Sequence, residues 1–368
     1  MIRKTLLAAT LLASAGVLFA AGAARADAVS DAKAYIAKVT APVTVWDGPT
    51  TGPKGVGHKL IVVVSTDQRN GGALGVSEGV QEAGKIMGWD VRVIDGQGSV
   101  NARAEGISQA VALKADGLVL DAIDAAEQAT ATEAALKAGI KVVGWHSGPV
   151  PGPMPKFGLF TNITTNPLEV AKAAASYAVA DSDGHAGAIV FTDSAYAIAI
   201  AKSNAMADII KACTTCKLLS IQDTPLADAA SRMPQLTTSL LTRFGSKWTY
   251  ALSINDLTFD FMAPALQSAG IAGDGVPHAS SAGDGSGPAF QRIRTGEYQV
   301  ATVAEPLRLH GWQEVDELNR AFAGVPASGY VAPPHLFIKA NIGRDGGPKG
   351  IFDPDNGYTD AYRKIWGK

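Results

Sequence analysis

From residue 59 onward the chain repeats one pattern, a short apolar run followed by a helical period, and this repetition limits the fold more than any other feature. The first run, Lys59–Ser65 with the sequence KLIVVVS, is apolar at consecutive positions, which predicts a strand buried on both faces. Residues 72–88 follow with apolar side chains at near-helical spacing. Strand–helix alternation of this kind predicts parallel sheets covered by helices on both faces, with right-handed crossovers.

The alternation continues to residue 323 and contains more strands than one sheet comfortably holds. We therefore expect two similar α/β lobes, for which 368 residues suffice. Further strands are expected at 91–95, 117–121, 141–145, 188–192, 217–221, 248–254, 277–282 and 299–304, and helices at 102–114, 125–138, 195–211, 226–244, 259–269, 288–295 and 311–323. Residues 27–58 and 341–368 break the pattern and are rich in Gly, Pro and Asp, so we expect both extensions to wrap the surface.

Residues 1–26 have the composition of a secretory signal peptide. Arg3 and Lys4 precede an apolar core, and Ala24-Arg25-Ala26 supplies a small-x-small cleavage site. The apolar core is shorter than the roughly 20 residues that a membrane span needs. We therefore expect export to the periplasm and a soluble mature protein that begins at Asp27.

The charge balance argues against a nucleic-acid surface. The chain carries 32 Lys and Arg against 34 Asp and Glu, and it contains no block of basic residues. Its two cysteines, Cys213 and Cys216, form a C-x-x-C without a second such pair or a His-x-x-x-His to complete a metal site. In an oxidising compartment we expect a local structural disulfide, with a redox role as the alternative.

Ligands of open parallel sheets bind beyond the carboxyl ends of the strands, so the side chains that follow each expected strand are candidate contacts. They are mostly hydrogen-bonding groups and carboxylates, which suit a neutral polyhydroxylated ligand or a cation better than a phosphate. Phosphate-loop, zinc-protease, serine-hydrolase and dinucleotide motifs are absent, so we expect a binding protein without catalytic residues, metal or cofactor. The candidates include Asp67, Asn70, Asp121, Trp145, His146, Asn255, Asp284 and Glu305.

Taken in order, several stretches resemble the type I periplasmic solute-binding proteins of ABC importers, in the ribose- and galactose-binding branch. They are KLIVVVST, ADGLVLDAIDAAE, GIKVVGWHSG, ALSINDLTFDFMAPALQSAG, SSAGDGS and ATVAEPL. The resemblance implies two doubly wound parallel-sheet lobes joined by a three-strand hinge, with crossings near Thr164, Pro306 and His335. It assigns 59–163 and 307–335 to an N-terminal lobe, and 164–306 with 336–340 to a C-terminal lobe.

The resemblance also implies ligand contacts at named positions. Asp121, Asn255, Asp284 and Glu305 fall at polar contacts of the family. Asn255-Asp256 and Asp284 have helix N-caps as the alternative role, and both roles can coexist. Asn204 falls near a family Arg on a helix of the second lobe. The relatives carry aromatic rings after the first strand, where this chain has Arg69-Asn70-Gly71-Gly72-Ala73. Trp145 and Tyr196 are the candidates to supply a ring instead.

His146 stands where the relatives carry an Asp-Arg pair, and it admits four roles: ligand contact, packed structural residue, general base or metal ligand. We expect a contact, because neutral imidazole donates at one nitrogen and accepts at the other. The implied function is capture of a small ligand, a sugar or polyol, by closure of a monomer that an ABC permease of the inner membrane then recognises. The alternatives are a sensor that engages a receptor kinase or chemoreceptor, and a binder of a non-sugar alcohol or amine.

Overall fold

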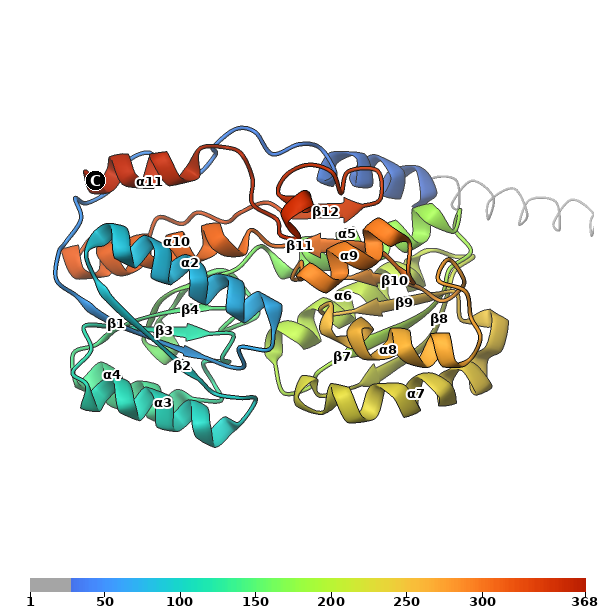
Figure 1. Ribbon diagram of the computed structural model, residues 1–368, viewed down its shortest axis with the longest axis horizontal. Helices are drawn as coiled ribbons and strands as arrows, with labels where there is room; N and C mark the ends of the chain where they lie inside the picture. The colour runs from blue at the N-terminus through green and yellow to red at the C-terminus, as the bar shows by residue number, and fades with distance from the viewer. Residues whose placement is uncertain (1–27) are drawn as a thin grey trace, which may run out of the picture.

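The computed structural model describes residues 28–368, and the candidate signal peptide at 1–26 lies outside this range. Two α/β lobes lie side by side, each built on a six-stranded sheet (Figure 1). The strand orders are β2-β1-β3-β4-β6-β5 and β12-β11-β10-β9-β7-β8. The two-lobe α/β fold class predicted from the sequence is therefore confirmed.

The N-terminal lobe places one pair of helices on each face of its sheet. Its strands are β1 (Leu60–Ser65), β2 (Asp90–Asp95), β3 (Gly117–Asp121), β4 (Lys141–Trp145), β5 (Gly152–Met154) and β6 (Leu159–Ile163). Its helices are α2 (Gly71–Met87), α3 (Val100–Ala112), α4 (Ala129–Lys137), α10 (Leu307–Ala323) and the single turn η1 (Pro155–Phe157). Ile61 and Val63 pack with α2 and α10, whereas Val62 and Val64 pack with α3 and α4. The apolar run of β1 is thus buried on both faces, as its composition predicts.

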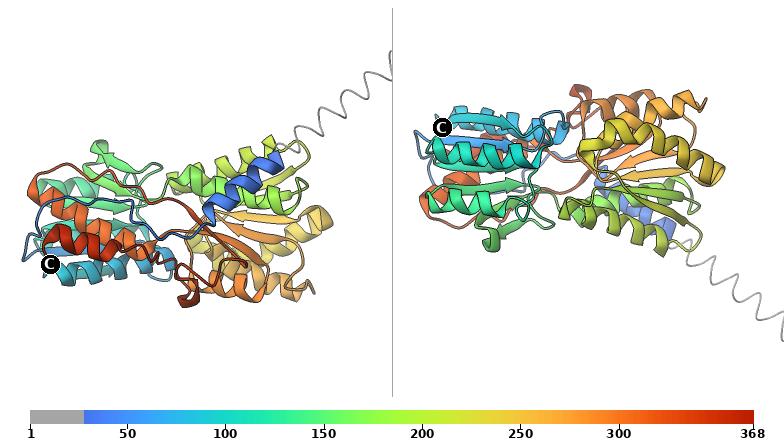
Figure 2. Two further views of the ribbon diagram at one scale, coloured as in Figure 1. Left: turned by 90° about the horizontal axis from the view of Figure 1, so that it is seen from above. Right: turned by 90° about the horizontal axis from the view of Figure 1, so that it is seen from below.

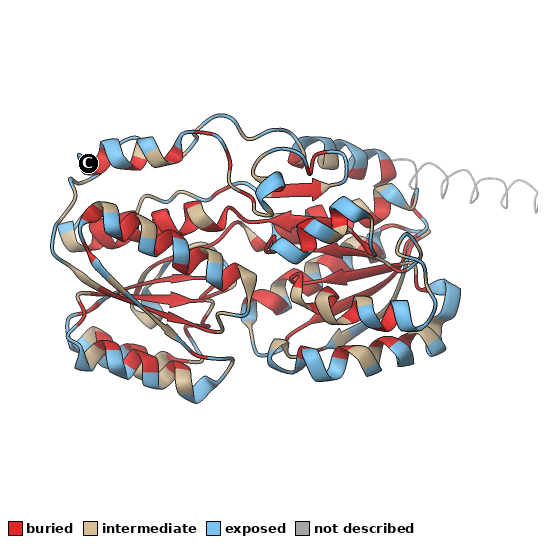
Figure 3. Ribbon diagram, in the orientation of Figure 1, coloured by how far each residue is buried: buried red, intermediate tan, exposed pale blue. Residues whose placement is uncertain are grey.

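The C-terminal lobe repeats this layered arrangement. Its strands are β7 (Gly187–Thr192), β8 (Lys217–Asp223), β9 (Tyr250–Ser253), β10 (His278–Ser281), β11 (Gln299–Ala304) and β12 (His335–Ile338). Its helices are α5 (Pro167–Asp181), α6 (Ala197–Ala212), α7 (Ala229–Phe244), α8 (Leu257–Ser268), α9 (Gly287–Thr295), η2 (Leu226–Asp228) and η3 (Gly245–Lys247). Cys213 and Cys216, between α6 and β8, are joined by a disulfide. In both lobes the central strands are buried, whereas the edge strands β2, β5 and β8 and the outer helix faces are partly exposed (Figure 3).

Both sheets carry an antiparallel strand at one edge, which the alternating pattern did not predict. β5 runs antiparallel to β6, and β12 runs antiparallel to β11. Each of these strands has at most four residues and is not paired with a helix in the repeating pattern. The alternation of strands and helices in the sequence therefore does not reveal them. β12 enters its sheet as the chain returns from the other lobe, and this approach fixes its direction.

Three segments of the core fold cross between the lobes: 164–166 after β6, 305–306 after β11, and 324–334 before β12. The two terminal extensions add further crossings along one side of the molecule (Figure 2). Residues 28–39 are helical and pack on the C-terminal lobe, and the chain then reaches Trp46 on the N-terminal lobe. The tail runs from η4 (Gly347–Lys349) to α11 (Tyr358–Trp366), which packs on α10. No helix of residues 28–368 is long and apolar enough to span a membrane.

Candidate ligand-binding site

The carboxyl ends of strands from both lobes meet at one small cavity of about 60 Å³. The loops after β1, β3 and β4 approach it from the N-terminal lobe, and those after β9 and β10 approach it from the C-terminal lobe together with α6. This is where open parallel sheets place their ligands. The lining residues are Thr66, Asn70, Ala122, Trp145, His146, Tyr196, Ile198, Ala199, Lys202, Leu226, Ile254, Asn255 and Asp284.

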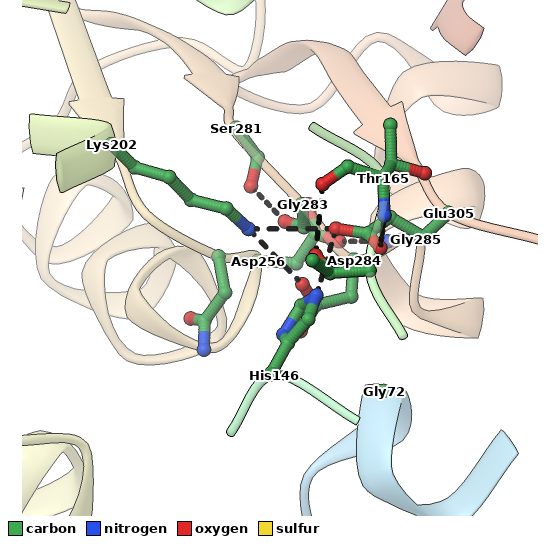
Figure 4. Close-up of polar contacts among 12 residues, drawn as sticks. Gly72, His146, Thr165, Lys202, Asp256, Ser281, Gly283, Asp284, Gly285 and Glu305 are labelled. Carbon is green, nitrogen blue, oxygen red and sulfur yellow. Dashed lines mark hydrogen bonds and ion pairs between the residues drawn. The ribbon is translucent and has the colours of Figure 1, made fainter. Parts of the chain in front are cut away.

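The floor of this cavity consists of His146, Lys202 and Asp284, with Glu305 behind them. His146 connects the two lobes there. Its Nε2 lies 3.0 Å from Oε1 of Glu305, the residue that follows β11 (Figure 4). The Trp145 ring stacks on the imidazole at 3.7 Å between ring centres, and its Nε1 donates to Nδ1 of His310 at 3.1 Å. His146 also adopts a positive φ of 52°, an uncommon backbone conformation for a residue other than glycine. The position of the His146 side chain is therefore fixed by the contacts of its ring and by the conformation of its backbone.

Lys202 brings a buried ammonium group to the same floor. Its Nζ lies 3.6 Å from Oε1 of Glu305 and 3.8 Å from Oδ1 of Asp284 (Figure 4). Its side chain is only 3% exposed. A buried charge of this kind persists because it is paired, and here it faces two carboxylates.

The outer part of the cavity is closed by hydrogen bonds between the lobes. The Tyr196 hydroxyl lies 3.2 Å from Oγ1 of Thr66, and the Ala197 backbone N–H donates to Oδ2 of Asp124 at 3.2 Å. In each pair one residue belongs to each lobe, so the structure represents a closed arrangement of the two lobes.

The comparisons with known proteins agree with this architecture. The model of the periplasmic binding protein domain matches residues 61–324. The chain belongs to the periplasmic binding protein family. Among curated proteins, none matches the chain.

Solved structures with the same fold include several named sugar-transport proteins. A sugar ABC transporter protein from Yersinia enterocolitica is 18% identical, with a TM-score of 0.69, and the match covers 86% of this chain and 100% of that one. A solute-binding protein from Agrobacterium vitis with bound allitol is 18% identical, with a TM-score of 0.65 and coverage of 78% and 97%. The arabinose-binding component from Shewanella is 16% identical, with a TM-score of 0.64 and coverage of 83% and 95%.

Within this periplasmic binding protein, several predicted site residues lie together at the cavity. Asn70, Trp145, His146, Tyr196, Asn255 and Asp284 all line it. Asn70 also caps α2, because its Oδ1 accepts from the Gly72 backbone N–H at 2.8 Å. Asn255 Oδ1 accepts from the Leu257 N–H at 3.1 Å. Asn70 therefore combines a helix cap with a place in the cavity lining. The N-cap position of α8 is Asp256, one residue after Asn255, and Ser286 caps α9, so neither Asn255 nor Asp284 is an N-cap.

Four other predicted residues do not line the cavity. Asp67 forms an ion pair with Arg69 at 2.6 Å and lines an outer hollow instead. Asp121 is fully buried and accepts a hydrogen bond from Ser77 Oγ at 2.8 Å. Asn204 is exposed and does not line the cavity, so the structure does not support the ligand contact predicted for it. Glu305 is fully buried behind His146 and Lys202, where it holds them without lining the cavity.

α6 reaches the cavity with a residue that the sequence did not predict. Lys202, not Asn204, reaches the cavity, because two residues along a helix turn the side chain through about 200°. Ile198, Ala199 and Lys202 share one helical face, and all three line the cavity. This shared face, three and four residues apart, is the signal that could have identified Lys202 in the sequence.

Burial and the charges of neighbouring groups shift the pKa values of Asp284, Glu305 and His310. Burial raises the pKa of Asp284 to about 6, although the Lys202 and His146 charges work in the opposite direction. Burial also works to raise the pKa of Glu305, but the His146 charge and hydrogen bond and the Lys202 charge outweigh it and hold the pKa well below its usual range. Burial lowers the pKa of His310 to about 4, so this imidazole is neutral near pH 7 and accepts the Trp145 N–H.

The floor also contains a set of groups that could hold a metal ion. Ligand atoms of His146, Asp284 and Glu305 lie within 4.8 Å of one another. The Lys202 ammonium is within 4 Å of both carboxylates, and it already supplies the positive charge that a cation would bring. The expectation of a site without a metal or cofactor stays a prediction.

Proposed function

We propose that this periplasmic binding protein is the exported substrate-binding component of an ABC importer, which captures a small polar ligand between its lobes. The observation that carries the proposal is the cavity itself, because hydrogen-bonding side chains from both lobes converge there. A ligand that contacts both lobes stabilises the closed arrangement over any open one. An inner-membrane permease would then recognise the closed monomer.

A sugar or polyol fits the chemistry of the lining. Asn70 and Asn255 offer amide donors and acceptors, Tyr196 offers a hydroxyl, and Lys202 and Asp284 offer charged partners for hydroxyl groups. Because the ammonium group already faces two carboxylates, the floor does not call for an anionic ligand. The allitol and L-arabinofuranose named for two structural neighbours support this class.

A second candidate ligand follows from the other walls of the cavity. Five of the lining residues are apolar: Ala122, Ile198, Ala199, Leu226 and Ile254. This composition favours a small alcohol or amine, whose polar group would face Lys202 and Asp284 and whose alkyl part would contact the apolar residues. A sensory role, with a receptor in place of the permease, would use the same closed form.

A thermal-shift screen over pentoses, hexoses, polyols, small alcohols and amines tests the proposal. A specific binder raises the melting temperature by mass action. Asn255→Ala and Asp284→Ala should each weaken that binder roughly tenfold or more in calorimetry, since each leaves a buried partner unsatisfied. Asn204→Ala, on the exposed face of α6, is the control. Unchanged affinity in both cavity variants would rule out this pocket as the binding site.

A further inference from the structure

Two consecutive glycines at the start of α2 lie close to the other lobe beside the cavity. A Cβ atom added to Gly71 would lie 3.0 Å from Cβ of Ser286, and one added to Gly72 would lie 2.6 Å from Oδ2 of Asp284. Real Cβ atoms essentially never come closer than about 3 Å to another heavy atom. Asp284 and Ser286 belong to the segment that follows β10. Because Gly71 and Gly72 have no side chains, this segment of the C-terminal lobe can come close to α2; Gly72 and Asp284 are labelled in Figure 4.

Other glycines of the same helix serve a different contact. A Cβ atom on Gly75 would meet Leu307 at 2.9 Å, and one on Gly79 would meet the Arg308 carbonyl oxygen at 2.6 Å. Both partners lie on α10, which packs against α2 within the N-terminal lobe. Four of the five glycines of α2 thus form a pair that faces the other lobe and a pair that allows packing against α10. The fifth, Gly84, lies against Val91 of the same lobe.

Two hollows adjoin at Asp284, close to Gly72. On one side lies the cavity of about 60 Å³, and on the other lies a hollow of about 590 Å³ lined by α2, α9 and the C-terminal tail. Asn70, Asn255 and Asp284 line both hollows. Ligand pockets for drug-sized molecules commonly measure about 300–1,000 Å³, so the cavity of about 60 Å³ is small.

We propose that Gly71 and Gly72 are the residues that set how far the lobes close, and that the ligand is a compact polar molecule without a substituent at its Gly72 edge. A single sugar ring or a short polyol meets this description, whereas a glycoside extended toward the larger hollow would collide with the wall between Gly72 and Asp284. The size limit rests on the proposed function, but the lobe contact is a property of the protein alone.

Cysteine cross-linking tests closure without any ligand, at a pair of positions that leaves Gly71 and Gly72 unchanged. A Cβ atom on Gly98 of the N-terminal lobe would lie 3.8 Å from Cβ of Ala227 in the C-terminal lobe, a separation typical of disulfides, so Gly98→Cys/Ala227→Cys can form this bond only when the lobes are closed. The native cysteines are already paired, so two new thiols can be counted by titration before and after mild oxidation. We expect the new thiols to disappear together, and a non-reducing digest to show the 98–227 link. Two thiols that stay free under oxidation would overturn the closed arrangement on which the proposal rests.

The double-cysteine variant also tests whether closure depends on the absence of a side chain at Gly72. Gly72→Ala should slow cross-linking roughly tenfold, because its methyl group opposes closure. Gly75→Ala is the matched control: its methyl group meets Leu307 of the same lobe and should leave the cross-linking rate unchanged. Adding Asp284→Ala to Gly72→Ala should restore the rate, since it removes the colliding carboxylate. Equal rates for Gly72→Ala and Gly75→Ala would contradict the proposal.

Gly71→Ala covers the case in which Gly72→Ala fails to fold, since the Gly72 methyl group would also meet Trp145 at 2.9 Å. The Gly71 methyl group has no neighbour within 4 Å other than Ser286, so it leaves the N-terminal lobe undisturbed. Small-angle scattering with allitol, myo-inositol and L-arabinose as probes should show less compaction for Gly71→Ala than for the unmodified protein. Equal compaction with a probe that binds would contradict the closure role. If no probe compacts the unmodified protein, cross-linking alone decides the closure role, and the proposed function is what has failed.

Discussion

The imidazole of His146 and the carboxylate of Glu305 lie 3.0 Å apart although they come from different lobes. Glu305 is fully buried, and its second oxygen accepts the Thr165 backbone N–H at 3.2 Å. Thr165 and Glu305 both belong to segments that cross between the lobes. The contact therefore ties the cavity floor directly to the hinge, so a ligand that touches His146 acts close to the axis of closure.

Replacement of His146 should weaken ligand binding more than it weakens the fold. His146→Ala removes the partner that Glu305 acquires from the other lobe, which makes the closed form less favourable. We expect the affinity for the strongest binder of the thermal-shift screen to fall roughly tenfold or more in calorimetry. His58→Ala, at an exposed histidine, should leave the affinity unchanged. An unaltered affinity in His146→Ala would assign this histidine to packing alone.

Replacement of Lys202 should destabilise the protein itself. Lys202→Met leaves the buried carboxylates of Asp284 and Glu305 without their ammonium partner, which costs roughly 3–5 kcal/mol for broken buried pairs. The loss of unfolding free energy, measured in urea at pH 7, should shrink toward pH 5 as the carboxylates take up protons. Asn204→Ala, two residues along the same helix, should change stability by less than about 0.5 kcal/mol. Similar effects of the two variants would contradict the placement of Lys202.

The buried carboxyl of Asp121 should make stability fall as the pH rises. Burial raises the pKa of Asp121 to about 7 from its usual value of 3.8, although hydrogen bonds from Ser77 and Ser65 oppose the shift. The folded protein therefore binds this proton more tightly than the unfolded chain does. The resulting stability is complete below about pH 4 and is lost as the pH approaches 7, at about 1.4 kcal/mol per pH unit.

Asp121→Asn should remove this dependence. The variant is expected to unfold at higher urea concentration than the unmodified protein at pH 8, and the difference should vanish near pH 4. Because Asp121 does not line the cavity, ligand affinity should be unchanged. A variant less stable than the unmodified protein at pH 8 would show that the carboxylate is better satisfied than its burial suggests.

The C-terminal extension should contribute to the stability of the N-terminal lobe. Trp366 stacks on Trp312 of α10 at 5.6 Å between ring centres, and its Nε1 donates to Oδ1 of Asp316 at 2.8 Å. Trp366→Ala should lower the unfolding free energy by roughly 3–5 kcal/mol, as measured in urea. Lys364→Ala on the exposed face of α11 is the control and should have little effect. A small loss for Trp366→Ala would mean that the extension is only loosely attached.

Much of the fold could be read from local patterns. The consecutive apolar residues of β1 predicted a strand covered on both faces, and the alternation predicted two α/β lobes; both predictions are confirmed. His146 could be placed at a strand end, because the apolar run of β4 stops at Trp145. These features depend on residues near one another in the sequence, where periodicity reports burial directly.

The tertiary structure alone decided which groups meet. Lys202 reaches Asp284 and Glu305 only because α6 turns this face toward the floor, and Asn204 points away for the same reason. The pair Gly71-Gly72 was visible as a loop without an aromatic ring, but its partners lie more than 200 residues away in the other lobe. Sequence periodicity tells which side of an element is buried. Contacts across two lobes depend on how the lobes close, and no local pattern records that.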